Sequence, residues 1–141
     1  MHLLLVEDNA GDALLVEAAL EGCEATTELH VSSDGDEALA YLRDDSEEAE
    51  RTRPQLVLLD LNLPGMSGTE VLDQMKTDPA LRAIPVVIFT GSRAADDVTG
   101  AYDRHANSFI TKPASFAGYG VVLRRIEEFW FSTAVLPEPP Q

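Results

Sequence analysis

The sequence predicts an α/β fold, a doubly wound five-stranded parallel sheet with helices on both faces. Five short apolar runs recur along the chain, and a helical pattern follows each of them. Strands that alternate with helices need crossover connections, which make the strands parallel. The length of 141 residues suits one domain, and a 45% hydrophobic composition is enough to build its core.

The predicted strands are short. The first spans residues 2–6 and is apolar after His2, and the second, 26–32, alternates Leu29 and Val31 with polar residues. The third and fourth, 56–59 and 86–89, are apolar throughout, and 108–111 is the fifth run. Continuous apolar runs of this length indicate strands buried on both faces, as in parallel sheets.

The predicted helices place apolar residues at helical spacing. They cover residues 10–22, 34–43, 68–76, 94–104 and 115–131. Gly22 suits a helix end. We expect a charged loop or frayed helix end at 44–53 and a mobile, proline-rich tail at 132–141. The predicted organisation is one domain, 1–131, with an extended last helix, followed by that tail.

The charge balance is strongly acidic. There are 25 acidic and 10 basic residues, a net charge of −15. Such a surface repels phosphate backbones and anionic lipids, so we expect no unaided binding to nucleic acid or membranes. The acid excess either aids solubility or marks a halophilic protein of a very salty cytosol. The presence of only two lysines, Lys76 and Lys112, favours the second interpretation.

Cysteine content and apolar runs bear on the compartment. Cys23, the one cysteine, permits no intramolecular disulfide and is interpreted as a small apolar filler. The apolar start is too short for a signal peptide, and no run reaches the ~18 residues of a membrane span. We therefore expect a cytoplasmic protein.

Polar side chains follow the first, third, fourth and fifth apolar runs. They are Glu7, Asp8, Asp60, Asn62, Thr90 and Lys112. In open α/β sheets the ligand site lies at the carboxyl ends of the strands, so we expect these residues to converge on one edge.

The chemistry of this set is coherent. Crowded carboxylates repel one another unless a cation joins them, and donors that are all oxygen indicate Mg²⁺ or Mn²⁺. Lys112 and Thr90 suit the oxygens of a phosphoryl group. A carboxylate can itself be the nucleophile, forming an acyl phosphate. Asp60 is the best candidate, because it ends the most apolar central run.

Four motifs carry a resemblance to a known family. VEDN (6–9), LLDLNLPGMSG (58–68), FTGS (89–92) and ITKP (110–113) occur in order. Together they closely resemble the response-regulator receiver domains of two-component signalling, from about residue 2 to 131. The resemblance implies a CheY-like fold with strand order 2-1-3-4-5. It also implies that Asp60 accepts a phosphoryl group from a sensor histidine kinase.

The same resemblance assigns roles to the site residues. Asp8, Asp60 and the backbone carbonyl of Asn62 would ligate Mg²⁺, with Glu7 acting through water. Thr90 and Lys112 would contact the phosphoryl group, and the protein would catalyse its own aspartyl phosphorylation and dephosphorylation.

The resemblance also implies two residues of a conformational switch. Phe109 resembles the aromatic that turns inward when the threonine moves toward the phosphoryl group. Pro113 is expected to follow a cis peptide bond that fixes the backbone of the preceding lysine.

The last helix carries a narrower resemblance. Its EEFWF sequence and the following VLP resemble stand-alone receivers paired with phytochrome-type sensor kinases, in which the last helix and tail often help form a dimer. Phe129, Trp130 and Phe131 are therefore interface candidates, on the face between the fourth and fifth predicted helices.

The expected output depends on a partner. Ten residues after 131 cannot hold a DNA-binding segment, so we expect output through an unknown downstream protein or through dimerisation. The alternative is a constitutive binding module that is never phosphorylated. An aspartate-nucleophile phosphatase would usually place its nucleophile after the first strand, and flavin binding would need a phosphate loop there, where EDNAGD is acidic.

Overall fold

The computed structural model describes residues 1–23 and 26–137. Within them lies a five-stranded sheet in the order β2-β1-β3-β4-β5, with every neighbouring pair parallel. The strands are β1 (His2–Val6), β2 (Glu28–Ser32), β3 (Leu56–Leu59), β4 (Val86–Thr90) and β5 (Ser108–Thr111). The predicted fold class and strand order are confirmed.

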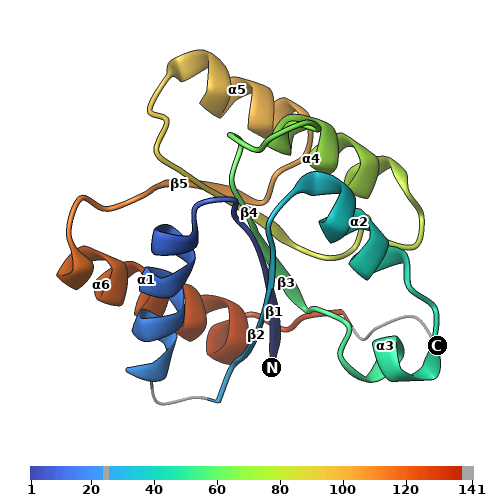
Figure 1. Ribbon diagram of the computed structural model, residues 1–141, viewed down its shortest axis with the longest axis horizontal. Coiled ribbons are helices and arrows are strands. Elements are labelled where there is room, and N and C mark those ends of the chain that lie inside the picture. The colour runs from blue at the N-terminus through green and yellow to red at the C-terminus, as the bar shows by residue number, and fades with distance from the viewer. Residues whose placement is uncertain (24–25, 138–141) are drawn as a thin grey trace.

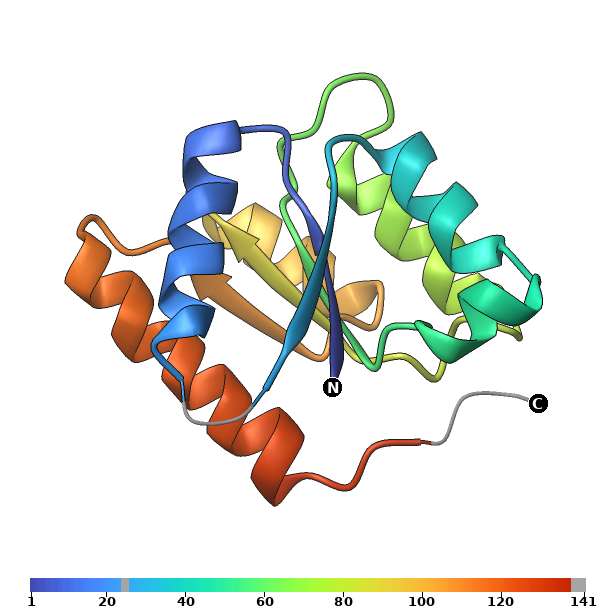
Figure 2. The same ribbon diagram turned by 60° about the horizontal axis from the view of Figure 1, so that its bottom comes forward.

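Helices cover both faces of the sheet (Figures 1 and 2). They are α1 (Ala10–Glu21), α2 (Gly35–Arg43), α3 (Glu47–Arg51), α4 (Gly68–Thr77), α5 (Ala95–Asp103) and α6 (Phe116–Glu127). Helices α1 and α6 lie on one face, and α2, α4 and α5 lie on the other (Figure 1). Among the described residues, no helix combines the length and hydropathy needed to cross a bilayer.

The sheet separates two hydrophobic cores. Along β1, Leu3 and Leu5 pack toward α1 and α6, whereas Leu4 and Val6 pack toward α2 and α4. The alternation follows from the period of two along a strand. All of β3 and β4 is buried, while β2 and β5 are edge strands with partly exposed residues. The central strands therefore hold the carboxyl edge in a rigid frame.

Polar caps determine where several helices begin. Asn9, Asp34, Ser67 and Ser115 each accept a hydrogen bond from the backbone N–H three residues further on. These bonds satisfy amides that a helix start leaves unpaired. At the other end of α1, Gly22 is the C-cap, as predicted.

Two segments differ from the sequence-based expectation. Within the predicted loop at 44–53 the chain forms the short helix α3, capped by Ser46. Beyond α6 the helix continues as a π-helical segment, Glu128–Thr133, two residues past the predicted end. Of the predicted tail, 138–141 lie outside the described residues, so its mobility stays a prediction.

Candidate functional site

The predicted site residues converge at the carboxyl edge of the sheet. Hydrogen bonds that continue the strand ladders hold their backbones there. The N–H of Glu7 donates to the Ser32 carbonyl (2.9 Å), that of Asp60 to Val6 (3.1 Å), and that of Lys112 to Thr90 (2.7 Å). Because the strands are parallel, these extensions bring residues 7, 60, 90 and 112 to one edge.

The Lys112 ammonium is the centre of the site. Its Nζ lies 2.7 Å from Glu7 Oε2, 2.8 Å from Asp60 Oδ2 and 2.8 Å from Asp12 Oδ2. Although burial opposes the charge, these carboxylates raise the pKa of Lys112 above its ordinary value. Sequence reasoning missed Asp12. Its position three residues after the helix cap Asn9 places it near the strand edge but does not identify Lys112 as its partner.

The Asp60 carboxylate is held by three donors. Thr90 Oγ1 donates to Oδ1 at 2.8 Å, the Asn62 N–H donates to the same oxygen at 3.0 Å, and Lys112 donates to Oδ2. Asp60 is buried, and burial alone would raise its pKa. The hydrogen bonds from Lys112, Asn62 and Thr90 instead hold the pKa of Asp60 below its ordinary value.

Glu7 has the opposite tendency. Burial raises the pKa of this carboxyl to about 7, although hydrogen bonds from Lys112 and from the Asn9 N–H (3.1 Å) act against the rise. The surroundings therefore favour the ionised form of Asp60 more strongly than that of Glu7. An ionised, oriented carboxylate can act as a nucleophile.

The acidic trio, defined here as Glu7, Asp8 and Asp60, can hold a cation. One carboxylate oxygen from each lies within 4.8 Å of the others, with Asp8 exposed and the other two buried. The donor set consists of oxygen alone, which fits a hard divalent ion. Asn62 contributes its N–H to Asp60, and a metal contact through its carbonyl stays a prediction.

The loop after β3 is fixed by a close backbone approach at Gly68. The Gly68 N–H donates to the Leu61 carbonyl at 3.0 Å. A Cβ added at Gly68 would lie 2.1 Å from the Asp60 carbonyl oxygen and 2.6 Å from Leu61 Cα. The final glycine of the LLDLNLPGMSG motif thus lets α4 start directly against the backbone of Asp60.

The switch candidates lie on β5 and at the end of β4. Phe109 packs, partly buried, against the core under α2, α4 and α5, and its N–H donates to the Tyr102 hydroxyl at 3.1 Å. Thr90 is fully buried with its hydroxyl on Asp60. Their part in switching stays a prediction.

The prediction of a cis bond before Pro113 is wrong for this structure, in which the Lys112–Pro113 peptide bond is trans. The trans form is the intrinsically favoured one, by about 0.5–1 kcal/mol. Lys112 is positioned without a cis bond. Its backbone N–H donates to the Thr90 carbonyl, and its ammonium contacts three carboxylates.

The predicted interface residues lie in the π-helical segment Glu128–Thr133, and one of the three is exposed. Phe129 is 53% exposed, and its ring meets that of Trp130 edge-to-face, with the ring centroids 5.1 Å apart. Trp130 and Phe131 are partly buried and pack against the core under α1 and α6. Phe129, Trp130, Ile110, Val122, Arg125 and Ile126 line a hollow of about 300 Å³.

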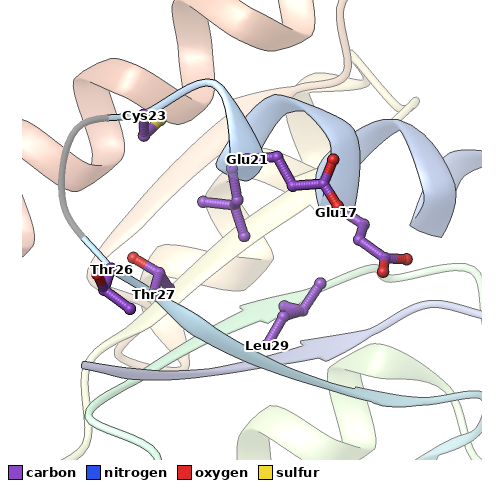
Figure 3. Close-up of a pocket in the computed structure, with 7 residues that line it drawn as sticks. Glu17, Glu21, Cys23, Thr26, Thr27 and Leu29 are labelled. Atoms are coloured by element: carbon purple, nitrogen blue, oxygen red, sulfur yellow. The ribbon is translucent and has the colours of Figure 1, made fainter.

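A second hollow, of about 390 Å³, lies between the end of α1 and the start of β2 (Figure 3). Glu17, Leu20, Glu21, Cys23, Thr26, Thr27 and Leu29 line it. It opens near the amino end of β2, whereas the acidic trio follows the carboxyl ends of β1 and β3. None of the predicted site residues lines it.

Comparisons with known proteins agree with this geometry. Residues 3–118 match the family model described as the response regulator receiver domain. Response regulator Rcp1 of Synechocystis sp. is 41% identical over 135 residues, which cover 96% of this chain and 92% of Rcp1.

Two solved structures extend the comparison. That of the phosphorylated cyanobacterial phytochrome response regulator RcpA is 46% identical, with a TM-score of 0.89 over 96% of this chain and 97% of that one. The Mn²⁺-bound form of Rcp1 is 41% identical, with a TM-score of 0.86 over 96% and 98% of the two chains. Likeness in sequence and fold over nearly its whole length shows that this chain belongs to the family of response regulator receiver domains.

Proposed function

We propose that Asp60 is the phosphoacceptor of this receiver and that a sensor histidine kinase presents the donor. One observation carries the assignment. Lys112, Thr90 and the Asn62 N–H all converge on the Asp60 carboxylate, which is also a member of the acidic trio.

The transfer follows from the residues that surround Asp60. The ionised carboxylate attacks the phosphorus of a phosphohistidine, an O–P bond forms, and the P–N bond breaks as the imidazole leaves. Lys112 and Thr90, which now hold the two carboxylate oxygens, are placed to donate to the transferred phosphoryl oxygens.

A divalent cation completes this site. We propose Mg²⁺, or Mn²⁺ as in the solved form of Rcp1, held by Glu7, Asp8, Asp60 and the Asn62 carbonyl. When bound, it neutralises carboxylate charge and draws negative charge from the phosphoryl oxygens.

Phosphorylation then switches the surface around β5. The added phosphoryl charge recruits Thr90 and Lys112, and this biases an equilibrium of α5, β5 and α6 in which Phe109 takes part. A shift from mostly off to mostly on needs about 5.5 kcal/mol of differential stabilisation. Two or three charge-assisted hydrogen bonds, each about 1.5–3 kcal/mol, are of that order.

The output surface is proposed to be the face of α5, β5 and α6. The exposed Phe129 and the adjoining hollow are suited to a second copy of the chain or to a downstream protein. Similarity to phytochrome response regulators supports a phytochrome-type kinase as the partner. We further propose a cytoplasmic location and, from the net charge of −15, a halophilic origin.

The test is intact-mass analysis after incubation with acetyl phosphate, with and without Mg²⁺, at high salt. We expect a Mg²⁺-dependent gain of one phosphoryl group that is absent from Asp60→Asn. Asp36→Asn is the matched control, because Asp36 is exposed on α2, away from the site. A protein that gains no phosphoryl group under any condition, including with a kinase, would support the constitutive binding module instead.

A further inference from the structure

The Lys112 ammonium uses all of its donors on carboxylates from three different elements. Glu7 follows β1, Asp60 follows β3, and Asp12 lies in the first turn of α1. An ammonium has three N–H groups, so each carboxylate takes one of them. The Lys112 side chain is only 12% exposed, which leaves little room for water as a substitute.

Two of the three partners have a second task in the proposed chemistry. Glu7 and Asp60 belong to the acidic trio that can hold a cation. Asp60 also loses its carboxylate charge once one of its oxygens is bonded to phosphorus in the acyl phosphate. Asp12 lies outside the trio, and among the described residues it is the ion-pair partner of Lys112 with no other part in the transfer.

The start of α1 places Asp12 for this contact. The Asn9 side chain caps the helix and accepts the Asp12 N–H at 3.0 Å. Side chains of a helix lean toward its N-terminus, so the Asp12 carboxylate is directed back toward the strand edge. It reaches a lysine 100 residues away in the sequence. The Asp12 side chain is 30% exposed, against 2% for that of Glu7, so Asp12 lies at the rim of the site.

We propose that Asp12 is a positioning residue that keeps the Lys112 ammonium beside the phosphoacceptor while Glu7 and Asp60 take up their other partners. The inference rests on the phosphoryl transfer proposed above. Asp12 acts through Lys112 and does not itself touch the reacting atoms.

The test compares Asp12→Asn with Asp12→Ala. Both substitutions remove the same charge, but Asn keeps an oxygen acceptor where Asp12 Oδ2 lies. The ratio of their phosphorylation rates at saturating acetyl phosphate and Mg²⁺ therefore reports the hydrogen bond alone. We expect Asp12→Asn to react about three- to tenfold faster than Asp12→Ala, the effect of one hydrogen bond. Glu17→Gln and Glu17→Ala, exposed on the same helix, are the control pair and should agree within about twofold.

A second measurement does not depend on phosphorylation. Trace labelling with a small amine acylating reagent, mapped by peptide mass, compares Lys112 with Lys76 as an internal reference. We expect Asp12→Ala to raise the labelling of Lys112 severalfold over wild type, and Asp12→Asn to restore most of its protection. Equal labelling of Lys112 in both folded variants would overturn the inference. Normal protection in a wild-type protein that gains no phosphoryl group would instead count against the proposed function.

Discussion

Gly68→Ala tests whether a single backbone approach holds the phosphoacceptor in place. The added Cβ would lie 2.1 Å from the Asp60 carbonyl oxygen, whereas real Cβ contacts essentially never fall below 3.0 Å. The start of α4 and the backbone of Asp60 must therefore separate by about 1 Å. Backbone shifts forced by overpacking cost about 1–3 kcal/mol. Loss of the Gly68 N–H bond to Leu61 adds about 1 kcal/mol.

We expect Gly68→Ala to lower the free energy of unfolding by about 2–4 kcal/mol, measured by urea denaturation. Phosphorylation by acetyl phosphate, followed by intact mass, should fall at least tenfold, because a 1 Å misplacement of a reacting group costs about 10²-fold in rate.

Gly120→Ala is the matched control. Gly120 lies inside α6, and nothing lies within 4 Å of a Cβ added there. This variant should gain up to about 1 kcal/mol from helix propensity and phosphorylate normally. If Gly68→Ala unfolded within about 0.5 kcal/mol of wild type and phosphorylated at the wild-type rate, the inference about this loop would be wrong.

Four further predictions follow from other parts of the structure. Folding raises the pKa of Glu7 from 4.5 to about 7, so the folded state binds a proton that the unfolded state has lost. The free energy of unfolding should therefore fall by up to about 3 kcal/mol as pH rises from 4.5 to 7. Urea denaturation in EDTA should show this fall in the wild type and a smaller one in Glu7→Gln. Lys76→Met should cost about 1–3 kcal/mol by the same assay, because Lys76 Nζ donates to the Arg82 carbonyl (3.1 Å), the Ile84 carbonyl (2.9 Å) and Asn107 Oδ1 (3.1 Å). Phe129→Ser should weaken phosphorylation-dependent self-association in analytical ultracentrifugation, and an unchanged sedimentation profile would count against the proposed output face. The unfolding temperature should rise markedly in molar KCl if the acidic surface is a halophilic adaptation, and a flat response would count against it.

The convergence of the site residues on one edge of the sheet was predictable, because it depends on the topology of the fold. Once strands and helices alternate, the ends of parallel strands must share an edge, and Glu7, Asp60 and Lys112 follow those ends directly. The core was predictable from the apolar pattern, because strands that are apolar throughout must be buried on both faces of the sheet.

What sequence reasoning missed depends on side-chain contacts between distant segments. The contact of Asp12 with Lys112 joins residues 100 apart and requires the relative placement of α1 and β5. The hydrogen bond from the Phe109 N–H to the Tyr102 hydroxyl likewise depends on how α5 packs beside β5. Neither leaves a local pattern in the sequence.

The remaining differences come from weak local signals. Helix α3 has five residues, so its formation depends on the Ser46 cap more than on any apolar period. A π-helical segment of six residues differs too little in spacing from an α-helix for its side-chain pattern to identify it. The cis bond before Pro113 came from resemblance alone, and no local pattern requires it.

Both lysine ammonium groups are held by oxygen atoms of the protein itself, which leaves arginine as the main source of free positive charge on the surface. Lys112 is held by carboxylates and Lys76 by carbonyl oxygens, and the other basic side chains, apart from histidine, are arginines. A partner that seeks a cation on this acidic protein therefore meets guanidinium groups. These are planar, bidentate and charged at any physiological pH. Neither lysine is freely exposed, so acetylation could not change this surface charge without a structural effect. An acetyl group on Lys112 would disturb the phosphorylation site, and one on Lys76 would disturb the packing of α4.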